Sequence, residues 1–355
     1  MRFTNKNSNN KHFGGKIVVL GGDFRQILPV MPKGRREDIV HATINASYLW
    51  DHCHVLTLTK NMRLQTGRSA AEVDELKKFS EWILSIGDGN AGKQVEDETI
   101  LDIPHDLLIP HSGDAMASIV NSTYPSFLQD YENPKFFQDC AILSPTNEIV
   151  DSLNEYMMSL LPRDEKTYLS ADNTCSSDIN YDSQDDTHTP EFLNTINSSG
   201  LPNHLLKLKK GALVMLLRNI DQSAGLCNGT RLIITEMGKY VLEGKVISKT
   251  NAGKRVATPR LTLTPSDRRI PFKFQRRQFP IALSFAMTIN KSQGQSLKSV
   301  GLYLPKPVFS HGQLYVAFSR VTHRKGLKIL ICDGDDSNSN STSNVVYKEV
   351  FRNLV

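Results

Sequence analysis

Residues 279–320 read FPIALSFAMTINKSQGQSLKSVGLYLPKPVFSHGQLYVAFSR and contain the patterns that decide the fold. The apolar run Ile281–Met287 passes into the small polar side chains, lysine and glycine of residues 288–294. This change predicts a buried strand that leads into the N-terminus of a helix. The free backbone N–H groups and the positive end of a helix dipole at such a junction suit a phosphate.

A second helix is predicted over residues 312–320. One side of this helix would carry Gln313, Val316 or Ala317, and Arg320. An arginine fixed on one face can bind a phosphate through its fork or neutralise charge in phosphoryl transfer. Lys291 alone also fits a solvated helix start, and Arg320 alone fits a surface cation. The two segments are therefore informative about function only as an ordered pair.

This ordered pair, a strand followed by TINKSQG and then YVAFSRV, resembles motifs V and VI of superfamily-one helicases. The resemblance is closest to the PIF-type (petite integration frequency) DNA helicases, which include the helicase part of Helitron transposons. It implies an α/β fold with ATP bound between two RecA-like domains and a small β-barrel inserted in the second. It also implies 5′→3′ DNA unwinding coupled to ATP hydrolysis, in genome maintenance, repair, recombination, telomere maintenance or transposition.

The N-terminal part contains a second recognisable segment. Residues 16–22, KIVVLGG, predict a central parallel strand, at whose C-terminal end open α/β sheets place ligand groups. Asp23 alone also fits a solvated residue in a strand-ending turn. GGDFRQILPV, however, resembles motif III of the PIF-type family, in which the glutamine, here Gln26, lies by the γ-phosphate. A neutral amide suits that task because it can accept from water and donate to phosphate.

Two further segments extend the resemblance. Residues 58–64, LTKNMRL, resemble motif IV, which makes Arg63 the candidate phosphate arginine; without that context it fits a surface arginine. The strand and turn AILSPTN, followed by a helix from Glu148 to Leu161, resemble the start of the second RecA-like domain. In that domain Thr146 and Asn147 would face the cleft or the DNA. A separate amphipathic helix, Glu72–Ile86, has apolar residues at helical spacing.

Short strands follow between residues 206 and 277. LKLKKGALVMLL and GTRLIIT, with the turn signal Asn228-Gly229, favour a small β-barrel. GLCNGTRLII also resembles a PIF-type stretch. Basic residues then alternate with aromatic ones, which favours a single-strand contact surface, although a plain charge run fits a solvated face. These residues are Arg260, Arg268, Arg269, Lys273, Arg276 and Arg277, with Phe272, Phe274 and Phe279.

Composition sets limits without deciding the function. The 355 residues allow two or three domains, and the net charge of +5 permits nucleic-acid binding without requiring it. The five cysteines are scattered without metal-ligand spacing, which favours reduced, structural thiols in an intracellular, and by the resemblance nuclear, protein. No run has the length of a membrane span, and the N-terminus lacks a signal-peptide core.

The sequence also departs from the family pattern. It has no phosphate loop GxxxxGK[ST] and no acidic pair of the DEAS or DEIS type for Mg²⁺. By the resemblance Asp23 belongs to motif III, so we predict no metal ligand. We expect an N-terminally truncated chain, which is a gene-model error, a decayed transposon copy or a real short product. Asn290 stands where many relatives have histidine.

From these observations we expect an α/β protein with four parts. Residues 1–135 would form a partial first RecA-like domain with linking helices, and 136–205 with 278–334 a complete second one. Residues 206–277 would form the inserted barrel, and 335–355 a tail.

The resemblance also assigns roles to residues. The catalytic candidates are Gln26, Arg63 and Arg320, and those near the nucleotide are Asp23, Gln293 and Gly294. The DNA-binding candidates are Thr146, Asn147, Thr288, Asn290, Lys291, Arg276 and Arg277.

The family implies ATP and Mg²⁺ as cofactors and, as partner, single-stranded DNA or a duplex with a single-stranded overhang. The main alternative is a non-catalytic single-strand-binding module, which the absent phosphate loop favours. An RNA-directed relative of the superfamily is a third hypothesis, against which GGDFRQ and CNGTRL count. Oligomeric state stays open.

Overall fold

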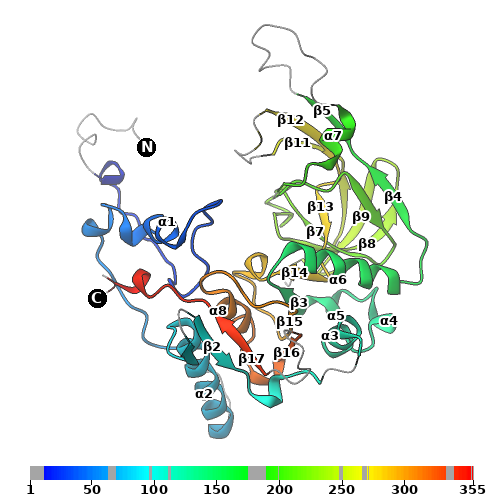
Figure 1. Cartoon of the computed structure of the whole chain (residues 1–355). Coiled ribbons are helices and arrows are strands. Elements are labelled where there is room, and N and C mark those ends of the chain that lie inside the picture. The colour runs from blue at the N-terminus through cyan, green and yellow to red at the C-terminus, as the bar shows by residue number, and fades with distance from the viewer. Residues whose placement is uncertain are drawn as a thin grey trace. The chain divides into compact units, whose positions relative to one another are not determined.

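The computed structural model describes residues 12–62, 69–95, 98–110, 113–174, 189–198, 200–247, 251–265, 270, 272–332, 340–352 and 354 (Figure 1). Contacts divide the chain into two compact units. Unit 1 consists of Met1–Leu108, Leu304–Arg324 and Ile331–Val355, and unit 2 of Ile109–Tyr303 with Lys325–Leu330. Each unit is therefore assembled from segments that are far apart in the sequence.

Unit 1 combines helices with a small antiparallel sheet. Its helices are α1 (Arg36–His41), α2 (Ala70–Gly87) and α8 (Gln313–Phe318), with short 3₁₀ turns at His12–Gly15, Ile44–Ala46, Trp50–His52, His105–Leu107 and Lys348–Phe351. Its sheet has the order β1-β2-β17, formed by β1 (Lys93–Val95), β2 (Glu98–Asp102) and β17 (Ser341–Asn344).

Helix α2 confirms the amphipathic helix that the sequence predicts. Ser69 caps it, because its hydroxyl accepts from the Glu72 backbone while the Glu72 carboxylate accepts from the Ser69 backbone. The apolar residues at helical spacing are buried, namely Leu76, Phe79, Ile83 and Ile86. Trp82 stacks on Phe318 of α8 with ring centroids 5.3 Å apart. The buried side of α2 thus holds α8 in place.

Unit 2 contains a four-stranded sheet in the order β14-β3-β15-β16, in which β14 and β15 both run parallel to β3. Its strands are β3 (Cys140–Ser144), β14 (Ala286–Thr288), β15 (Ser299–Leu304) and β16 (Leu327–Ile331). Helix α6 (Asn147–Leu160) covers one face, while α3 (Ala115–Thr123) and α5 (Pro134–Gln138) cover the other (Figure 1). Because both faces are covered, the strands are almost continuously apolar. The mixed α/β class is confirmed.

Antiparallel strands make up the rest of unit 2. One sheet has the order β10-β9-β8-β7-β13, a second β11-β12-β5, and a third β4-β6. The strands are β4 (Lys166–Leu169), β5 (Ala171–Thr174), β6 (Leu205–Leu208), β7 (Leu213–Leu216), β8 (Arg231–Met237), β9 (Val241–Val246), β10 (Arg255–Pro259), β11 (Leu261–Leu263), β12 (Phe274–Gln278) and β13 (Ile281–Leu283), with the short helices α4 (Phe127–Asp130) and α7 (Pro190–Thr195). No sheet closes on itself within the described residues, so the predicted closed barrel is not confirmed.

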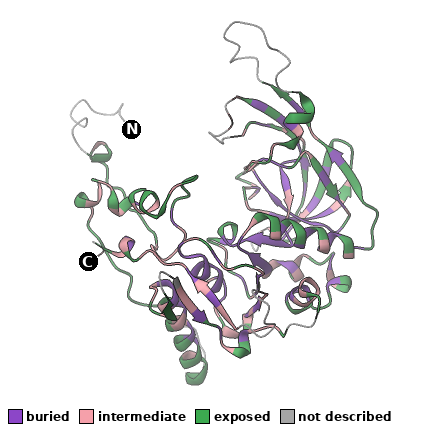
Figure 2. Cartoon of the chain, in the orientation of Figure 1, coloured by how far each residue is buried: buried purple, intermediate pink, exposed green. Residues whose placement is uncertain are grey.

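The predicted strand at residues 16–22 is wrong. The backbone there forms no strand, and the side chains of Ile17 and Val19 are 96% and 89% exposed. The run Val55–Leu58 is likewise irregular, and its Leu58 is 97% exposed. Figure 2 shows this part of unit 1 mostly in the colours of exposed and half-buried residues. An apolar run becomes a strand only when other strands take up its hydrogen bonds, and the described residues place none beside it.

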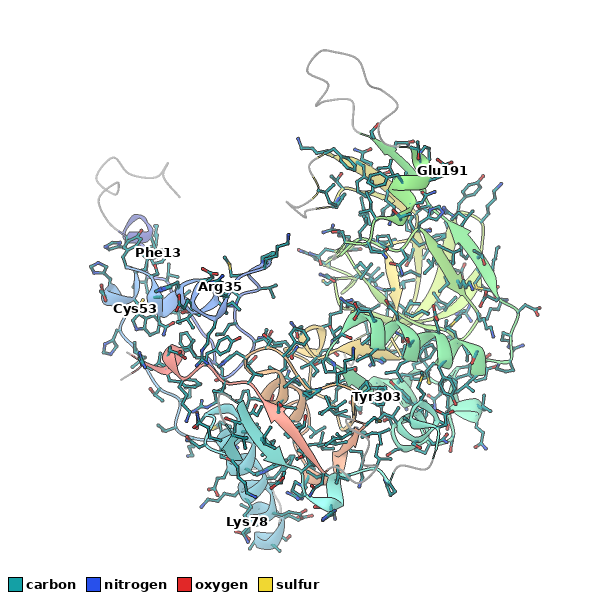
Figure 3. All side chains as sticks on the ribbon, viewed as in Figure 1. Phe13, Arg35, Cys53, Lys78, Glu191 and Tyr303 are labelled. Atoms are coloured by element: carbon teal, nitrogen blue, oxygen red, sulfur yellow. The ribbon has the colours of Figure 1, made fainter. Side chains whose placement is uncertain are left out.

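Two general properties of the chain complete the description. None of the described cysteines, which are Cys53 (labelled in Figure 3), Cys140, Cys227 and Cys332, forms a disulfide. Among the helices that the structure describes, none has the length and apolar character to cross a membrane.

Candidate functional site

In unit 1 the loop of residues 23–26 is fastened to helix α8. The Tyr315 hydroxyl donates to Asp23 Oδ2 at 2.7 Å, and Gln26 Nε2 lies 3.5 Å from the same oxygen. The other carboxylate oxygen, Oδ1, accepts from the Arg25 backbone at 3.1 Å. Arg25 Nε in turn donates to Asp88 at 2.6 Å, just beyond α2. Asp23 therefore organises the loop that presents Gln26.

A second attachment lies one helical turn earlier in the chain. His311 is fully buried; its Nε2 lies 2.8 Å from the Phe24 carbonyl oxygen, and its Nδ1 accepts from the Tyr347 backbone at 2.8 Å. The Nε2–H tautomer satisfies both bonds. Burial lowers the pKa of His311 below its ordinary 6.5. The neutral ring thus joins the 23–26 loop to the C-terminal segment.

Gly312 makes this close approach possible. Its φ is +74°, and a Cβ atom there would collide with the Arg25 carbonyl oxygen and the Gln26 backbone. Only glycine tolerates both the left-handed backbone and the contact. The glycine that starts α8 is therefore a docking surface for the loop.

Arg320 follows the C-terminal end of α8 and is 7% exposed. Its Nε donates to the Val316 carbonyl at 2.8 Å, and one terminal nitrogen donates to Ser319 Oγ at 2.9 Å. Its charge also acts on Tyr315: burial, then the hydrogen bond to Asp23, raises the pKa of Tyr315, and Arg320 opposes that rise. The structure thus brings Asp23, Gln26 and the Arg320 helix together, although they are nearly 300 residues apart. Arg63 lies outside the described residues.

Five of the seven predicted DNA-binding residues lie at the C-terminal ends of two strands in unit 2. Strands β3 and β14 are parallel, with Ser144 opposite Thr288, so the residues that follow both strands leave at the same end. Thr146 and Asn147 start α6, while Asn290 and Lys291 follow β14. Burial raises the pKa of Asp151 on α6, and the charge of Lys291 opposes that rise, so the two side chains are near one another.

Asn154, which the sequence analysis missed, fixes the end strand β14. Its amide donates to the Ala286 carbonyl at 3.1 Å and accepts from the Ala286 N–H at 2.9 Å. It therefore takes the place of a neighbouring strand at a sheet edge. A polar residue on the apolar side of the 148–161 helix was the available signal.

The segment after β14 corrects one prediction. A 3₁₀ turn of 3 residues, Asn290–Ser292, replaces the expected helix. The Ile289 N–H donates to the Ser144 carbonyl, and the chain then turns at Gly294, whose φ is +80°. So short a turn has no helix dipole, so this segment does not offer a phosphate the positive end of a helix.

Gln293 and Gly294 line a cavity of about 710 Å³ that we call the polar pocket. Most of its lining comes from the turn before β8 and the loop after β14. Its lining residues are Gln138, Asn228, Gly229, Thr230, Arg231, Ile247, Lys291, Gln293, Gly294, Gln295, Ser296 and Leu297. Both the TINKSQG and the CNGTR segments therefore contribute to one cavity.

Arg276 does not face solvent, contrary to its prediction as a DNA contact. It is 0% exposed and pairs with Asp172 at 2.7 Å. The rest of its guanidinium donates to the carbonyl oxygens of Ile196, Pro202 and Leu193. The alternation of β12 puts Arg277 on the exposed face instead. Arg276 therefore holds α7 and β5 together. Of these two arginines, only Arg277 stays a candidate DNA contact.

Two of the three aromatic residues of this region are core, and Phe272 is partly buried against them. Phe274 and Phe279 are 0% exposed, and Phe274 packs with Leu193, Leu201 and Leu263. Buried rings cannot stack on bases, so the interleaved pattern misled the sequence analysis here. Arg268 and Arg269 lie outside the described residues.

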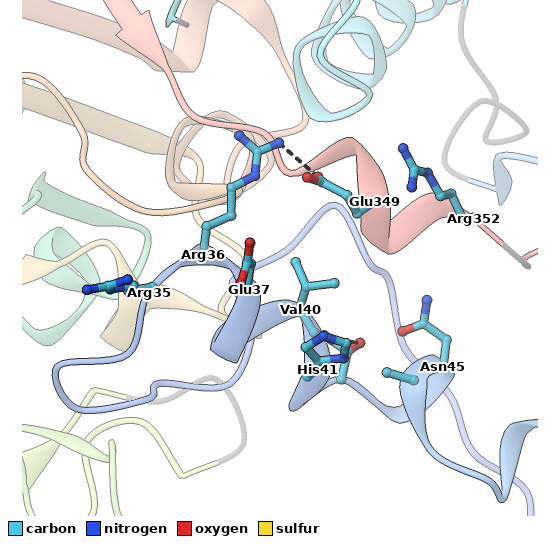
Figure 4. A pocket seen from close by; sticks show the side chains of 10 residues that line it. Arg35, Arg36, Glu37, Val40, His41, Asn45, Glu349 and Arg352 are labelled. Atoms are coloured by element: carbon cyan, nitrogen blue, oxygen red, sulfur yellow. Dashed lines mark hydrogen bonds and ion pairs between the residues drawn. The ribbon is translucent and has the colours of Figure 1, made fainter.

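Unit 1 also has a surface cavity of about 820 Å³ beside α1 (Figure 4). Arg36 and Glu349 form an ion pair of 2.8 Å across it, and this contact lowers the pKa of Glu349. Arg35 and Arg352 flank the pair, and Asn45 donates to the Val350 carbonyl at 2.9 Å. The cavity is polar and partly self-neutralised.

The cofactors that the resemblance implies are ATP and Mg²⁺. No group of three or more His, Cys, Asp or Glu side chains gathers in the described parts of the chain. Asp23, the acid nearest Gln26, already accepts hydrogen bonds from Tyr315 and Arg25. The sequence has no phosphate loop.

Two family models match the chain. Residues 1–97 match the PIF1-like helicase model, and residues 191–237 match the 2B domain of the DNA helicase Pif1. These two segments of the chain are similar to PIF1-type helicases. The two matches include the GGDFRQ loop and the CNGTR turn, whereas the Arg320 helix and the TINKSQG loop lie outside them.

A curated relative and two solved structures agree with this family. The ATP-dependent DNA helicase PIF1 of Xenopus laevis is 32% identical over 190 residues, which are 52% of this chain and 26% of the relative. The Pif1 helicase of Candida albicans has a TM-score of 0.62 at 22% identity, covering 97% of this chain and 69% of that one. A Bacteroides Pif1 in complex with ADP-AlF3 and ssDNA has a TM-score of 0.56 at 20% identity, covering 93% and 65%. These structures share the fold with this chain, which spans about a quarter of the Xenopus relative.

Proposed function

We propose that this chain functions as an ATP-dependent 5′→3′ DNA helicase of the PIF1 type. The observation that carries the proposal is the attachment of the Gln26 loop to the Arg320 helix through Asp23 and Tyr315. A loop fastened in this way moves with the helix, so a change at one residue is transmitted to the other. Gln26 and Arg320 would face the nucleotide. The phosphate loop that would hold its phosphates is not in this sequence.

The strand would be held by unit 2. Thr146, Asn147, Thr288, Asn290 and Lys291 leave the same end of two adjacent parallel strands, where α/β sheets place their ligands. Among these Lys291 is a cation and is exposed, which suits a phosphate of the DNA backbone. Arg277, exposed on β12, would add a second cation.

We also propose a nuclear location, which a DNA-directed function supports. The expected partner is single-stranded DNA or a duplex with a single-stranded overhang, in keeping with the Bacteroides Pif1 solved with ssDNA.

The deciding experiment measures ATP hydrolysis by the 355-residue chain with and without oligo-dT, alongside strand binding over a salt series. Turnover stimulated by the strand supports an active helicase motor in this chain. Binding without turnover supports the alternative, a non-catalytic single-strand-binding module. Absence of both would refute the proposal.

A residue-level test separates the two units. Lys291→Ala should weaken oligo-dT binding and lower the salt slope, d log K/d log [salt], by about 0.7, the value for one phosphate contact on a single strand. Arg320→Ala should leave binding within about twofold, because Arg320 is assigned to the nucleotide. If Arg320→Ala weakened binding as much as Lys291→Ala, the assignment of Arg320 would be wrong.

A further inference from the structure

The segment that carries Arg320 contacts Trp82 of helix α2 at two points. The ring of Phe318, two residues before Arg320, stacks on the Trp82 ring with centroids 5.3 Å apart and planes 17° apart. The guanidinium carbon of Arg324, four residues after Arg320, lies 5.6 Å from the centroid of the same ring. A cation at this distance from an indole is attracted to it. Trp82 therefore holds the chain on both sides of Arg320.

A carboxylate keeps Arg324 beside the ring. The Nε and one terminal nitrogen of Arg324 donate to the two carboxylate oxygens of Asp106 at 2.7 and 2.8 Å, a bidentate pair. The hydrogen bond to Asp106 raises the pKa of Arg324; burial opposes that rise, and the charge of Glu75 adds to it. Glu75 and Trp82 are seven residues apart and share one side of α2. The guanidinium is thus fixed by Asp106 and attracted to α2.

The position of Arg320 depends on the end of helix α8. The Arg320 side chain donates to Val316 and Ser319, which belong to that end of the helix and move with it. Helix α8 has 6 residues, and so short a helix is not stable without packing. Phe318, its last residue, is fully buried and stacks on Trp82. Packing against Trp82 therefore helps to fix where the Arg320 guanidinium lies.

We propose that Trp82 is a positioning residue for Arg320, and that Asp106 supports it by holding Arg324 against the ring. The inference rests on the proposed function, in which Arg320 faces the nucleotide. An arginine that neutralises charge in phosphoryl transfer is effective when its guanidinium is already in place before the reaction. The proposal gives helix α2, which carries none of the recognised motifs, a part in placing that charge.

The test uses the full 355-residue chain and three variants. Trp82→Leu keeps an apolar side chain and removes the ring, whereas Trp82→Phe keeps a ring at that position. Asp106→Asn removes the charge that holds Arg324, at an exposed site where the fold should be retained. Asp74→Asn makes the same change in the exposed pair with Lys78 on α2, and is the matched control.

The Nε–H signal of Arg320 in ¹⁵N spectra reports its position, because that group donates to the Val316 carbonyl. Its exchange with water should rise about tenfold in Trp82→Leu, the combined effect of a lost ring stack and a lost cation–π contact. The rise should be about threefold in Asp106→Asn, as expected from an exposed ion pair. Trp82→Phe should restore most of the protection, and Asp74→Asn should match the unmodified chain.

Two results would overturn the proposal. One is unchanged exchange at Arg320 in both Trp82→Leu and Asp106→Asn. The other is an equal rise at the backbone amides of α2, which would show general loosening of unit 1 in place of a specific effect on the arginine. If Trp82→Leu does not fold, Asp106→Asn decides by the same signal.

ATP turnover separates this proposal from the proposed function. If the unmodified chain hydrolyses ATP, Trp82→Leu should lower kcat about tenfold and leave KM within about twofold, because a misplaced arginine weakens transfer more than binding. Equal turnover in Trp82→Leu and the unmodified chain would overturn the positioning role while the proposed function stands. If the unmodified chain hydrolyses no ATP, the motor function fails, and exchange at Arg320 alone decides whether Trp82 positions the arginine.

Discussion

Tyr315→Phe removes one hydroxyl and tests whether α8 fixes the Gln26 loop. The hydroxyl donates to Asp23 Oδ2 at 2.7 Å, a short bond to a charged acceptor. Such bonds contribute about 1.5–3 kcal/mol. The Asp23 side chain is 23% exposed, so water can replace part of the lost bond. We therefore expect the lower end, about 1.5 kcal/mol, which corresponds to roughly tenfold in the opening equilibrium of the loop.

Amide hydrogen exchange reports this opening directly. The Arg25 N–H donates to Asp23 Oδ1, and the Gln26 N–H donates to the Asp23 carbonyl at 3.0 Å. Both amides should exchange about tenfold faster in Tyr315→Phe, since local opening exposes them to water. The amides of α2 should keep their exchange rates, because the helix cap and the packing of its buried side are unchanged.

The control is Tyr156→Phe, the same change on helix α6 of unit 2, where the hydroxyl has no hydrogen-bond partner among the described residues. It should leave exchange at Arg25 and Gln26 as it is. Equal exchange at these amides in both variants would refute the idea that Asp23 and Tyr315 fasten the loop.

Three further predictions concern stability. Asp172→Asn leaves the buried Arg276 without its anion and should lower the free energy of unfolding of unit 2, measured in urea, by about 3–5 kcal/mol. The control Glu236→Gln removes an exposed ion pair and should change that free energy by less than about 1 kcal/mol. Gly312→Ala should destabilise unit 1 by at least about 1–3 kcal/mol in thermal unfolding, because the new Cβ meets the 23–26 loop. The pKa of His311 is lowered in the folded state, so the unfolded state binds the proton more tightly. The free energy of unfolding should therefore fall as the pH drops below about 6.5. A His311→Gln variant, measured at pH 7.5 and pH 5.5, should lose that pH dependence. An unchanged pH dependence in the variant would show that other groups cause it.

The sequence predicted the parts of the fold that depend on local periodicity. Helix α2 follows from apolar spacing and β14 from a short apolar run, while β3 and α6 follow from AILSPTN and the segment after it. Periodicity reports which side of an element is buried but not which partner buries it. For that reason KIVVLGG, which has the same pattern as β3, was expected to be a strand and lies exposed instead.

The candidate site was predictable only where a motif could be recognised. Gln26 and Arg320 were assigned from their segments, and the structure places both segments together in unit 1. Tyr315 was missed, although a buried tyrosine hydroxyl on an apolar helix needs a partner and so gives a signal. Arg276 was misassigned because a basic residue in a strand can point either way, and only the position of Asp172 shows which.

The exposed run around Ile17 and Val19 also affects how this chain behaves in solution. A short, β-branched segment with little charge and no proline can pair edge to edge with the same segment of another copy. The net charge of +5 keeps copies apart, and salt screens that repulsion. Raising the ionic strength should therefore release the bound single-stranded DNA and, at the same time, promote self-association of the chain. A salt titration of this chain reports on DNA binding alone only while light scattering shows that the copies stay separate.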